Sequence, residues 1–194
     1  LAASTLASST LVLMHASVAN HSTVVYLQQE LYSGAQGTQA LTPVGDLTGD
    51  GVPDLVVFRT DSITGPRTGA VALLELSLQG AVRSTSLIHA AQVSGVLPTA
   101  PRFGISITVV DTSRATGALS LLVGIPTHDS KGAVALLEIS RGWRLRRSAL
   151  VEDGSSSFPA GVLTNDEFGE AVASLGDLDG DGKLDLVATA PNVD

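Results

Sequence analysis

The chain has 194 residues, which is enough for one sizeable domain with a buried core. Its formal net charge of -8 at pH 7 and the lack of a long basic tract argue against nucleic acid as a partner. There is no cysteine, so disulfides do not stabilise the fold, and no apolar run approaches the roughly 20 residues that a membrane-spanning helix needs.

The N-terminal segment, residues 1–36, is largely apolar and contains the triplet Asn20-His21-Ser22, which is an N-glycosylation sequon. We predict that Asn20 lies in an exposed loop between two strands and is glycosylated if the protein passes through a eukaryotic secretory route. Residues 16–19 have some features of a signal cleavage site. The repeat pattern described next accounts for the same residues better.

An internal repeat organises the chain. The sequence GAVALLEL at Gly69–Leu76 returns 63 residues later as GAVALLEI at Gly132–Ile139. In the same way, VGDLTGDGVPDLVVF from Val44 returns as LGDLDGDGKLDLVAT from Leu175. Repeats of this kind indicate a fold built from similar stacked units. They divide the chain into a partial repeat at 1–36, repeats at 37–101 and 102–166, and a partial repeat at 167–194.

Short runs rich in Val, Leu and Ile alternate with turns rich in Gly, Asp, Ser and Thr, which is typical of β-strands. No long run has helical periodicity. We therefore expect an all-β fold of propeller-type blades, each with four antiparallel strands and about 65 residues. The expected strands include Leu55–Phe58, Val71–Leu76, Ser106–Val110, Leu121–Ile125, Val134–Ile139 and Leu186–Ala190.

Two acidic loops, Asp46–Asp54 and Asp177–Asp185, share the pattern D-x-[DT]-x-D-G-x-x-D. Oxygen donors at alternate positions of a tight loop converge on one point, and Ca²⁺ takes six to eight oxygen ligands. Glycine after the third donor permits the turn that brings the later residues back. The expected side-chain donors are Asp46, Thr48, Asp50 and Asp54 in the first loop, and Asp177, Asp179, Asp181 and Asp185 in the second.

The pattern differs from an EF-hand, because the twelfth position of each loop is Val57 or Ala188 instead of a bidentate Glu. A surface turn of Asp and Gly that binds no metal is the alternative interpretation of both loops. We expect the first loop to bind Ca²⁺ more weakly, because Thr48 replaces a carboxylate. The copy near Asp111 has lost the other acids and is expected to bind none. The role of the ions is predicted to be structural.

Phe168-Gly169 followed by LGDLDGDGKLDLVATAP resembles the FG-GAP repeat of integrin alpha-chain propellers and of many secreted proteins. Phe103-Gly104 followed by LLVGIP is a second match. The resemblance implies that the backbone carbonyls of Val52 and Lys183 complete the two Ca²⁺ sites. It also implies a ring of seven blades. Three repeats do not fill such a ring, so we expect a longer chain or several chains to complete it.

The main basic cluster surrounds Trp143. We interpret it as an outer strand in which Trp143 and Leu145 face inward and Arg144 and Arg146 face solvent. An anionic partner or a glycan surface is the alternative interpretation. The cluster consists of Arg141, Arg144, Arg146 and Arg147.

These features favour an extracellular, Ca²⁺-binding module that recognises a protein or glycan ligand, as the resemblance to integrin propellers and FG-GAP lectins implies. One alternative is a structural subunit of an extracellular filament or surface coat, assembled from copies of the chain. A weaker one is a non-catalytic propeller of a secreted hydrolase. The histidines are scattered, and no nucleophile–histidine–acid pattern is evident, so we expect no enzymatic activity.

Overall fold

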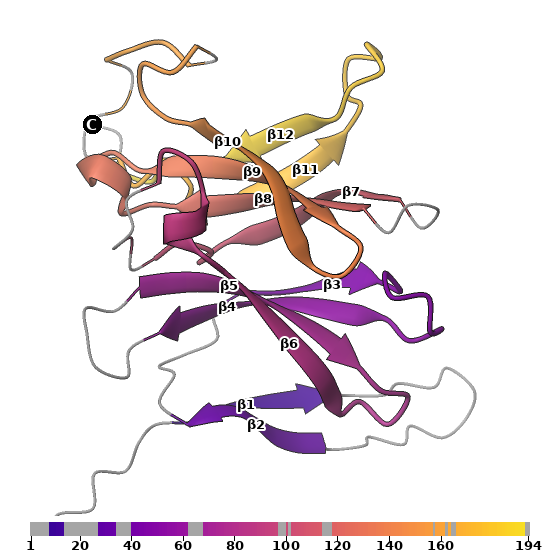
Figure 1. Ribbon diagram of the computed structural model, residues 1–194. Coiled ribbons are helices and arrows are strands. Elements are labelled where there is room, and N and C mark those ends of the chain that lie inside the picture. Colours follow the sequence, from indigo (N-terminus) through magenta and orange to yellow (C-terminus); the bar gives the residue numbers. More distant parts are fainter. Residues whose placement is uncertain are drawn as a thin grey trace, which may run out of the picture.

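The computed structural model describes residues 8–13, 27–33, 40–61, 68–96, 100, 102–113, 118–156, 158–161, 163 and 166–192. The predicted glycosylation site at Asn20 lies outside these residues. Within them the fold is all-β, as expected, with two four-stranded and two two-stranded antiparallel sheets. The sheets form an open stack and do not close into a ring over the described residues (Figure 1).

The first four-stranded sheet, sheet A, has its strands in chain order, with each strand paired to the next. Strands β1 (Ser8–Leu13) and β2 (Leu27–Ser33) form a separate pair on one side of it (Figure 1). Sheet A consists of β3 (Leu41–Gly45), β4 (Asp54–Asp61), β5 (Thr68–Leu76) and β6 (Val82–His89).

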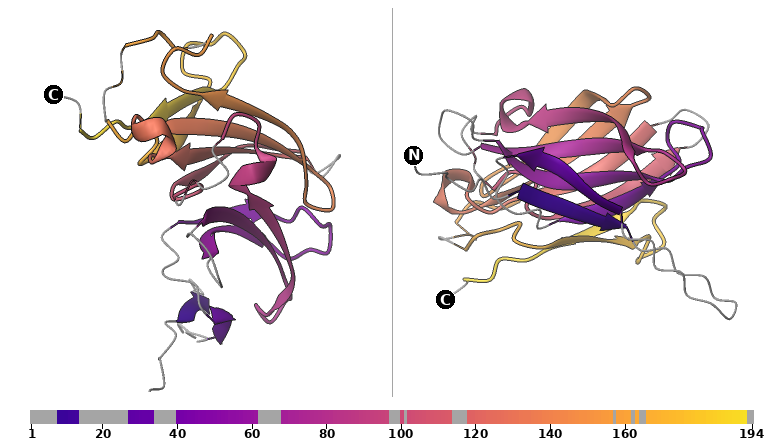
Figure 2. Two further views of the ribbon diagram at one scale, coloured as in Figure 1. Left: turned by 60° about the vertical axis from the view of Figure 1, so that its left-hand side comes forward. Right: turned by 90° about the horizontal axis from the view of Figure 1, so that it is seen from below.

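Sheet B repeats this arrangement and lies over the other face of sheet A (Figure 2). The last pair, sheet C, follows it and corresponds to the first two strands of a repeat. Short 3₁₀ helices, η1 (Ala90–Gln92) and η2 (His128–Ser130), lie in the connections. Sheet B consists of β7 (Ile107–Ser113), β8 (Ala118–Ile125), β9 (Ala133–Ser140) and β10 (Arg144–Val151), and sheet C of β11 (Val172–Gly176) and β12 (Asp185–Ala188).

The GAVALLE sequences form the third strand of each four-stranded sheet, and the copy in β5 is buried on both faces. In β5, Val71 and Leu73 belong to the apolar cluster between sheets A and B, whereas Ala72 and Leu74 belong to a cluster on the opposite face. Successive side chains of a strand point to opposite faces, so a strand covered on both sides needs an uninterrupted apolar run. The sequence of β5 therefore follows from its place inside a stack.

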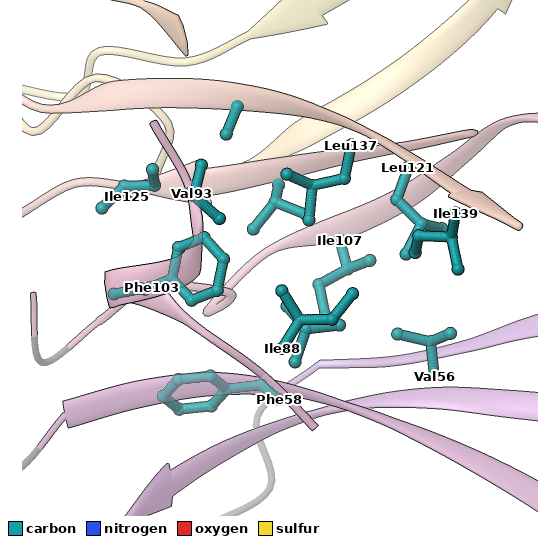
Figure 3. Packing of buried hydrophobic residues seen from close by; sticks show 14 of the residues in the cluster. Val56, Phe58, Ile88, Val93, Phe103, Ile107, Leu121, Ile125, Leu137 and Ile139 are labelled. Atoms are coloured by element: carbon teal, nitrogen blue, oxygen red, sulfur yellow. The ribbon is translucent and has the colours of Figure 1, made fainter. Parts of the chain in front are cut away.

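The main core fills the space between sheets A and B (Figure 3). Phe58 and Ile88 of sheet A face Leu121 and Leu137 of sheet B, and Phe103 lies between them with no exposed surface. Burial of each such side chain stabilises the fold by about 1.5–3 kcal/mol. The two sheets are therefore held together mainly by apolar packing.

Each Phe-Gly pair joins one repeat to the next. A Cβ atom on Gly69 of sheet A would overlap the backbone of Phe103, and one on Gly132, just before β9, would overlap the backbone of Phe168. The glycine of each pair bonds within its own repeat: the N–H of Gly104 donates to the carbonyl of Gly124 at 3.0 Å. The glycine that begins each GAVALLE run is thus required by the close approach of the following repeat.

No helix in the described residues is long and apolar enough to cross a membrane.

Candidate metal centre

Three carboxylates gather in the loop that joins β11 to β12. One oxygen from each of Asp177, Asp179 and Asp185 lies within 4.8 Å of the other two. Among the described residues this is the only group of three or more acidic or histidine side chains that meets in this way. Asp177 and Asp179 are exposed and Asp185 is half-buried. The loop projects from the same side of the stack as loop 46–54, at the right of Figure 1.

The local sequence folds this loop around its own carboxylates. The N–H groups of Gly180 and Gly182 donate to the two oxygens of Asp177, at 2.8 and 3.0 Å. The N–H of Leu178 donates to Asp185 at 2.7 Å, which joins the start of the loop to its end. Gly180 and Gly182 have φ angles of 79° and 81°, which favour glycine. The alternation of Asp and Gly therefore produces the turn without help from other elements.

Asp181, the third expected donor, does not join this group. Its carboxylate accepts from the backbone N–H of Lys183 at 2.8 Å and from the Lys183 ammonium group at 2.7 Å. The hydrogen bond from that ammonium group lowers the pKa of Asp181 below its ordinary value. The predicted role of the Lys183 carbonyl rests on the resemblance alone.

Loop 46–54, between β3 and β4, has the same backbone pattern. The N–H groups of Gly49 and Gly51 donate to Asp46 at 2.7 and 3.0 Å, and the N–H of Leu47 donates to Asp54 at 3.2 Å. Asp46 thus takes the place of Asp177, and the two loops have the same fold.

The acids of loop 46–54 are used differently. Asp54 is fully buried and accepts a second hydrogen bond from the N–H of Leu76 at 3.3 Å. Burial raises the pKa of Asp54 above its ordinary value, and the backbone donors around it oppose that shift. Asp50 forms an ion pair with Arg83 of β6 at 2.8 Å. Asp46, Asp50 and Asp54 do not form a carboxylate cluster like that of the second loop, in which Asp177, Asp179 and Asp185 correspond to Asp46, Thr48 and Asp54.

One atom of the first loop fits a metal ligand. The Oγ1 of Thr48 is buried and has no hydrogen-bond partner. A buried hydroxyl without a partner is unfavourable, and a cation among the oxygens of the loop would satisfy it. Val52 packs in an apolar cluster on the outer face of sheet A, and its predicted carbonyl contact rests on the resemblance alone.

The donor chemistry of the second loop fits Ca²⁺ well. Asp177, Asp179 and Asp185 offer only oxygen, which hard cations such as Ca²⁺ prefer, and their mutual repulsion favours a cation between them. The first loop fits less well, because Thr48 stands where the second loop has the carboxylate of Asp179. Sequence reasoning missed Arg83. It lies 33 residues from Asp50 in the chain, and only the pairing of β6 with β5 brings it near the loop.

Trp143 and Leu145 pack against the main core and Arg144 and Arg146 are exposed, as expected for an outer strand. Asp111 lies within β7 instead of a loop. Without the other acids and glycines of the motif, the strand continues through this position.

Comparison with known protein families matches residues 168–194 to the FG-GAP repeat. The matched segment begins at the Phe168-Gly169 pair and contains β11, the loop with the three gathered carboxylates, and β12. The expected FG-GAP repeat is therefore confirmed at this end of the chain.

Proposed function

We propose that this chain is a calcium-binding FG-GAP module of an extracellular protein and that it recognises a protein or glycan ligand. The calcium part is supported by one observation above the others, the approach of Asp177, Asp179 and Asp185 to within 4.8 Å of one another. The recognition part is supported by the FG-GAP repeat at 168–194 and by the resemblance of its sequence motif to integrin propellers.

The proposed role of the ion is structural. Bound Ca²⁺ would supply positive charge to a loop whose three gathered carboxylates otherwise repel one another. Asp177 directly follows β11 and Asp185 begins β12, so the gathered acids hold the two strands of sheet C in register. Rigid sheets of this kind are suitable scaffolds for recognition loops.

A structural subunit of a filament or coat is the second candidate, and one observation favours it. Sheet C and its loop carry a group of exposed apolar side chains, and such groups mark interaction surfaces. This surface suits packing against another sheet. It consists of Leu175, Leu178, Leu184, Leu186 and Val187.

Calcium titration tests the proposal. At a calcium concentration of 100 times Kd, binding stabilises the folded state by about 2.7 kcal/mol, which is about 5–10 °C in thermal midpoint for a domain of this size. We expect EDTA to remove this increase. Asp179→Asn should abolish most of it, whereas Asp111→Asn, the same change in the repeat copy without the motif, should leave it intact.

A thermal midpoint that EDTA leaves unmoved would contradict the calcium part. The recognition part is tested separately by electron microscopy of the native protein. Monodisperse particles support recognition, whereas polymers support the structural subunit.

A further inference from the structure

A groove of about 480 Å³ lies between the outer edges of sheets A and B. This volume falls within the range of about 300–1,000 Å³ that is typical of ligand sites. Neither metal loop contributes to its lining. One side consists of Ser86, Leu87 and Ile88 of β6 with Gln92 of η1, and the other of Gly142, Trp143, Arg144 and Leu145.

Strand edges form both sides of the groove. β6 is the last strand of sheet A and β10 is the last strand of sheet B, and both cross in the foreground of Figure 1. Successive side chains of a strand point to opposite faces, so a groove lined by Ser86, Leu87 and Ile88 in succession runs along the edge of β6. An edge strand presents backbone N–H and C=O groups without a strand partner. The groove therefore offers backbone hydrogen bonds to an extended segment.

The second side of the groove carries unbalanced positive charge. The arginines of the turn and of β10 are exposed, and over the described part of the chain they form no ion pair. This is notable in a chain with a net charge of -8. Arg144 lines the groove, whereas Arg147 lies on the same strand outside the lining. The groove is thus suited to an acidic partner.

The turn that carries this side is fixed in an uncommon conformation. Trp143 has a φ angle of 62°, which is unfavourable for a bulky residue, and such strain persists where surrounding contacts enforce it. Its half-buried side chain packs against the main core, and its N–H donates to the Ser140 carbonyl at 3.0 Å. A hydrogen bond of 3.2 Å from Ser94 N–H to Ser148 Oγ joins the two sheets further along β10. The groove is therefore formed before any ligand binds.

We propose that this groove binds an extended acidic peptide segment of a partner protein, which pairs with the edge of β6 and places carboxylates against Arg144. The inference rests on the proposed recognition function and names its class of ligand. Strand addition to an exposed edge is a general mode of peptide recognition. An acidic saccharide would satisfy the arginine but not the regularly spaced backbone groups of β6, so the peptide is favoured.

The test uses the single tryptophan of the chain, Trp143, as a reporter. The probe is an acetylated and amidated octapeptide in which Glu and Val alternate, added to the whole chain in calcium buffer. We expect a saturable change in tryptophan fluorescence below about 1 mM peptide. We also expect amide hydrogen exchange to slow in residues 82–89. No change in either measurement would overturn the proposal.

Matched controls separate strand pairing from charge. The same peptide with Lys in place of Glu should not bind, and the Glu peptide with alternate backbone nitrogens methylated should bind much more weakly. Arg144→Glu should raise Kd roughly tenfold or more, and Arg147→Glu less than about threefold. Equal effects of the two substitutions, or equal binding of the Lys peptide, would overturn the proposal. So would saturation by polygalacturonate with no response to the Glu peptide.

The calcium proposal and the groove proposal can be contradicted separately. If calcium raises the thermal midpoint and the Glu peptide does not bind, only the groove is wrong. If the peptide binds to a chain whose midpoint ignores calcium, only the calcium part of the proposed function is wrong.

Discussion

The two acidic loops have the same fold but different surroundings. In each loop the first Asp accepts from the N–H groups of two glycines, and the last Asp accepts from the N–H of the residue after the first Asp. Yet Leu47 of the first loop is 6% exposed, and its counterpart Leu178 in the second is 75% exposed. The turn from Arg141 to Trp143 of sheet B shares a small cavity with Leu47 and Thr48, whereas no described residue covers Leu178.

This difference separates what the motif determines from what its neighbours determine. The Asp and Gly residues alone set the path of the backbone, because they satisfy its N–H groups within the loop. Contacts outside the first loop set its exposure and charge: Leu76 and Arg83 of its own sheet contact Asp54 and Asp50, and the turn of sheet B lies beside Leu47. The same nine-residue motif is therefore partly buried in one repeat, whereas over the described residues it is exposed and carries a carboxylate cluster in the other.

The largest expected difference in stability is between substitutions of Asp54 and Asp185, the last aspartates of the two loops. Asp54→Ala removes the acceptor for two buried N–H groups, those of Leu47 and Leu76, and we expect it to lower the free energy of unfolding by about 2–4 kcal/mol. Asp185→Ala, in the exposed loop, should cost less than about 1 kcal/mol. Urea unfolding in EDTA measures both changes without a contribution from metal. Equal losses would show that burial does not distinguish the loops.

The next largest expected difference in stability is between substitutions of Leu47 and Leu178. Leu47→Ala leaves a cavity beneath the turn of sheet B and should cost about 2–3 kcal/mol. Leu178→Ala removes a side chain that is already in solvent and should change the free energy of unfolding by less than about 0.5 kcal/mol. The same urea titration applies. A substantial loss for Leu178→Ala at low protein concentration would mean that this side chain is covered in solution.

The smallest expected difference in stability is between substitutions of Arg83 and Lys183, which pair with Asp50 and Asp181. Arg83→Gln should lower the free energy of unfolding by about 0.2–1 kcal/mol, because the ion pair with Asp50 is largely exposed. Lys183→Gln should have no measurable effect on stability, because Lys183 and Asp181 are exposed neighbours in one loop. If Arg83→Gln also allows calcium to raise the thermal midpoint of Asp179→Asn, then Arg83 keeps metal from the first loop.

Features set by a short stretch of sequence could be predicted. The GAVALLE strands lie within three residues of their expected bounds, because an apolar run between turns leaves few alternatives. The acidic loops were located in the same way. By contrast, the fourth strand expected in this repeat was not located, because β6, an edge strand with several polar, exposed positions, lacks an apolar run.

Features that depend on distant contacts could not be predicted. The pairing of Asp50 with Arg83 requires the register between β5 and β6, and the cover over Leu47 comes from a turn about 95 residues further along the chain. The raised pKa of Asp54 likewise reflects burial. The second loop has the same motif but is exposed, so the motif does not predict this burial. Motif spacing carries no signal for such neighbours.

The contact between Phe103 and Gly69, and its counterpart between Phe168 and Gly132, has a consequence for how such chains can lengthen or shorten. Each contact has one half in a repeat and the other half in the repeat that follows. If one full repeat length is duplicated or deleted, wherever in the repeat the change begins, each phenylalanine again contacts an equivalent glycine in the repeat before it. An insertion next to Gly69 or Gly132 would instead disrupt the contact with the phenylalanine of the following repeat. Each contact between a phenylalanine and the glycine of the preceding repeat therefore helps to keep the repeat length constant.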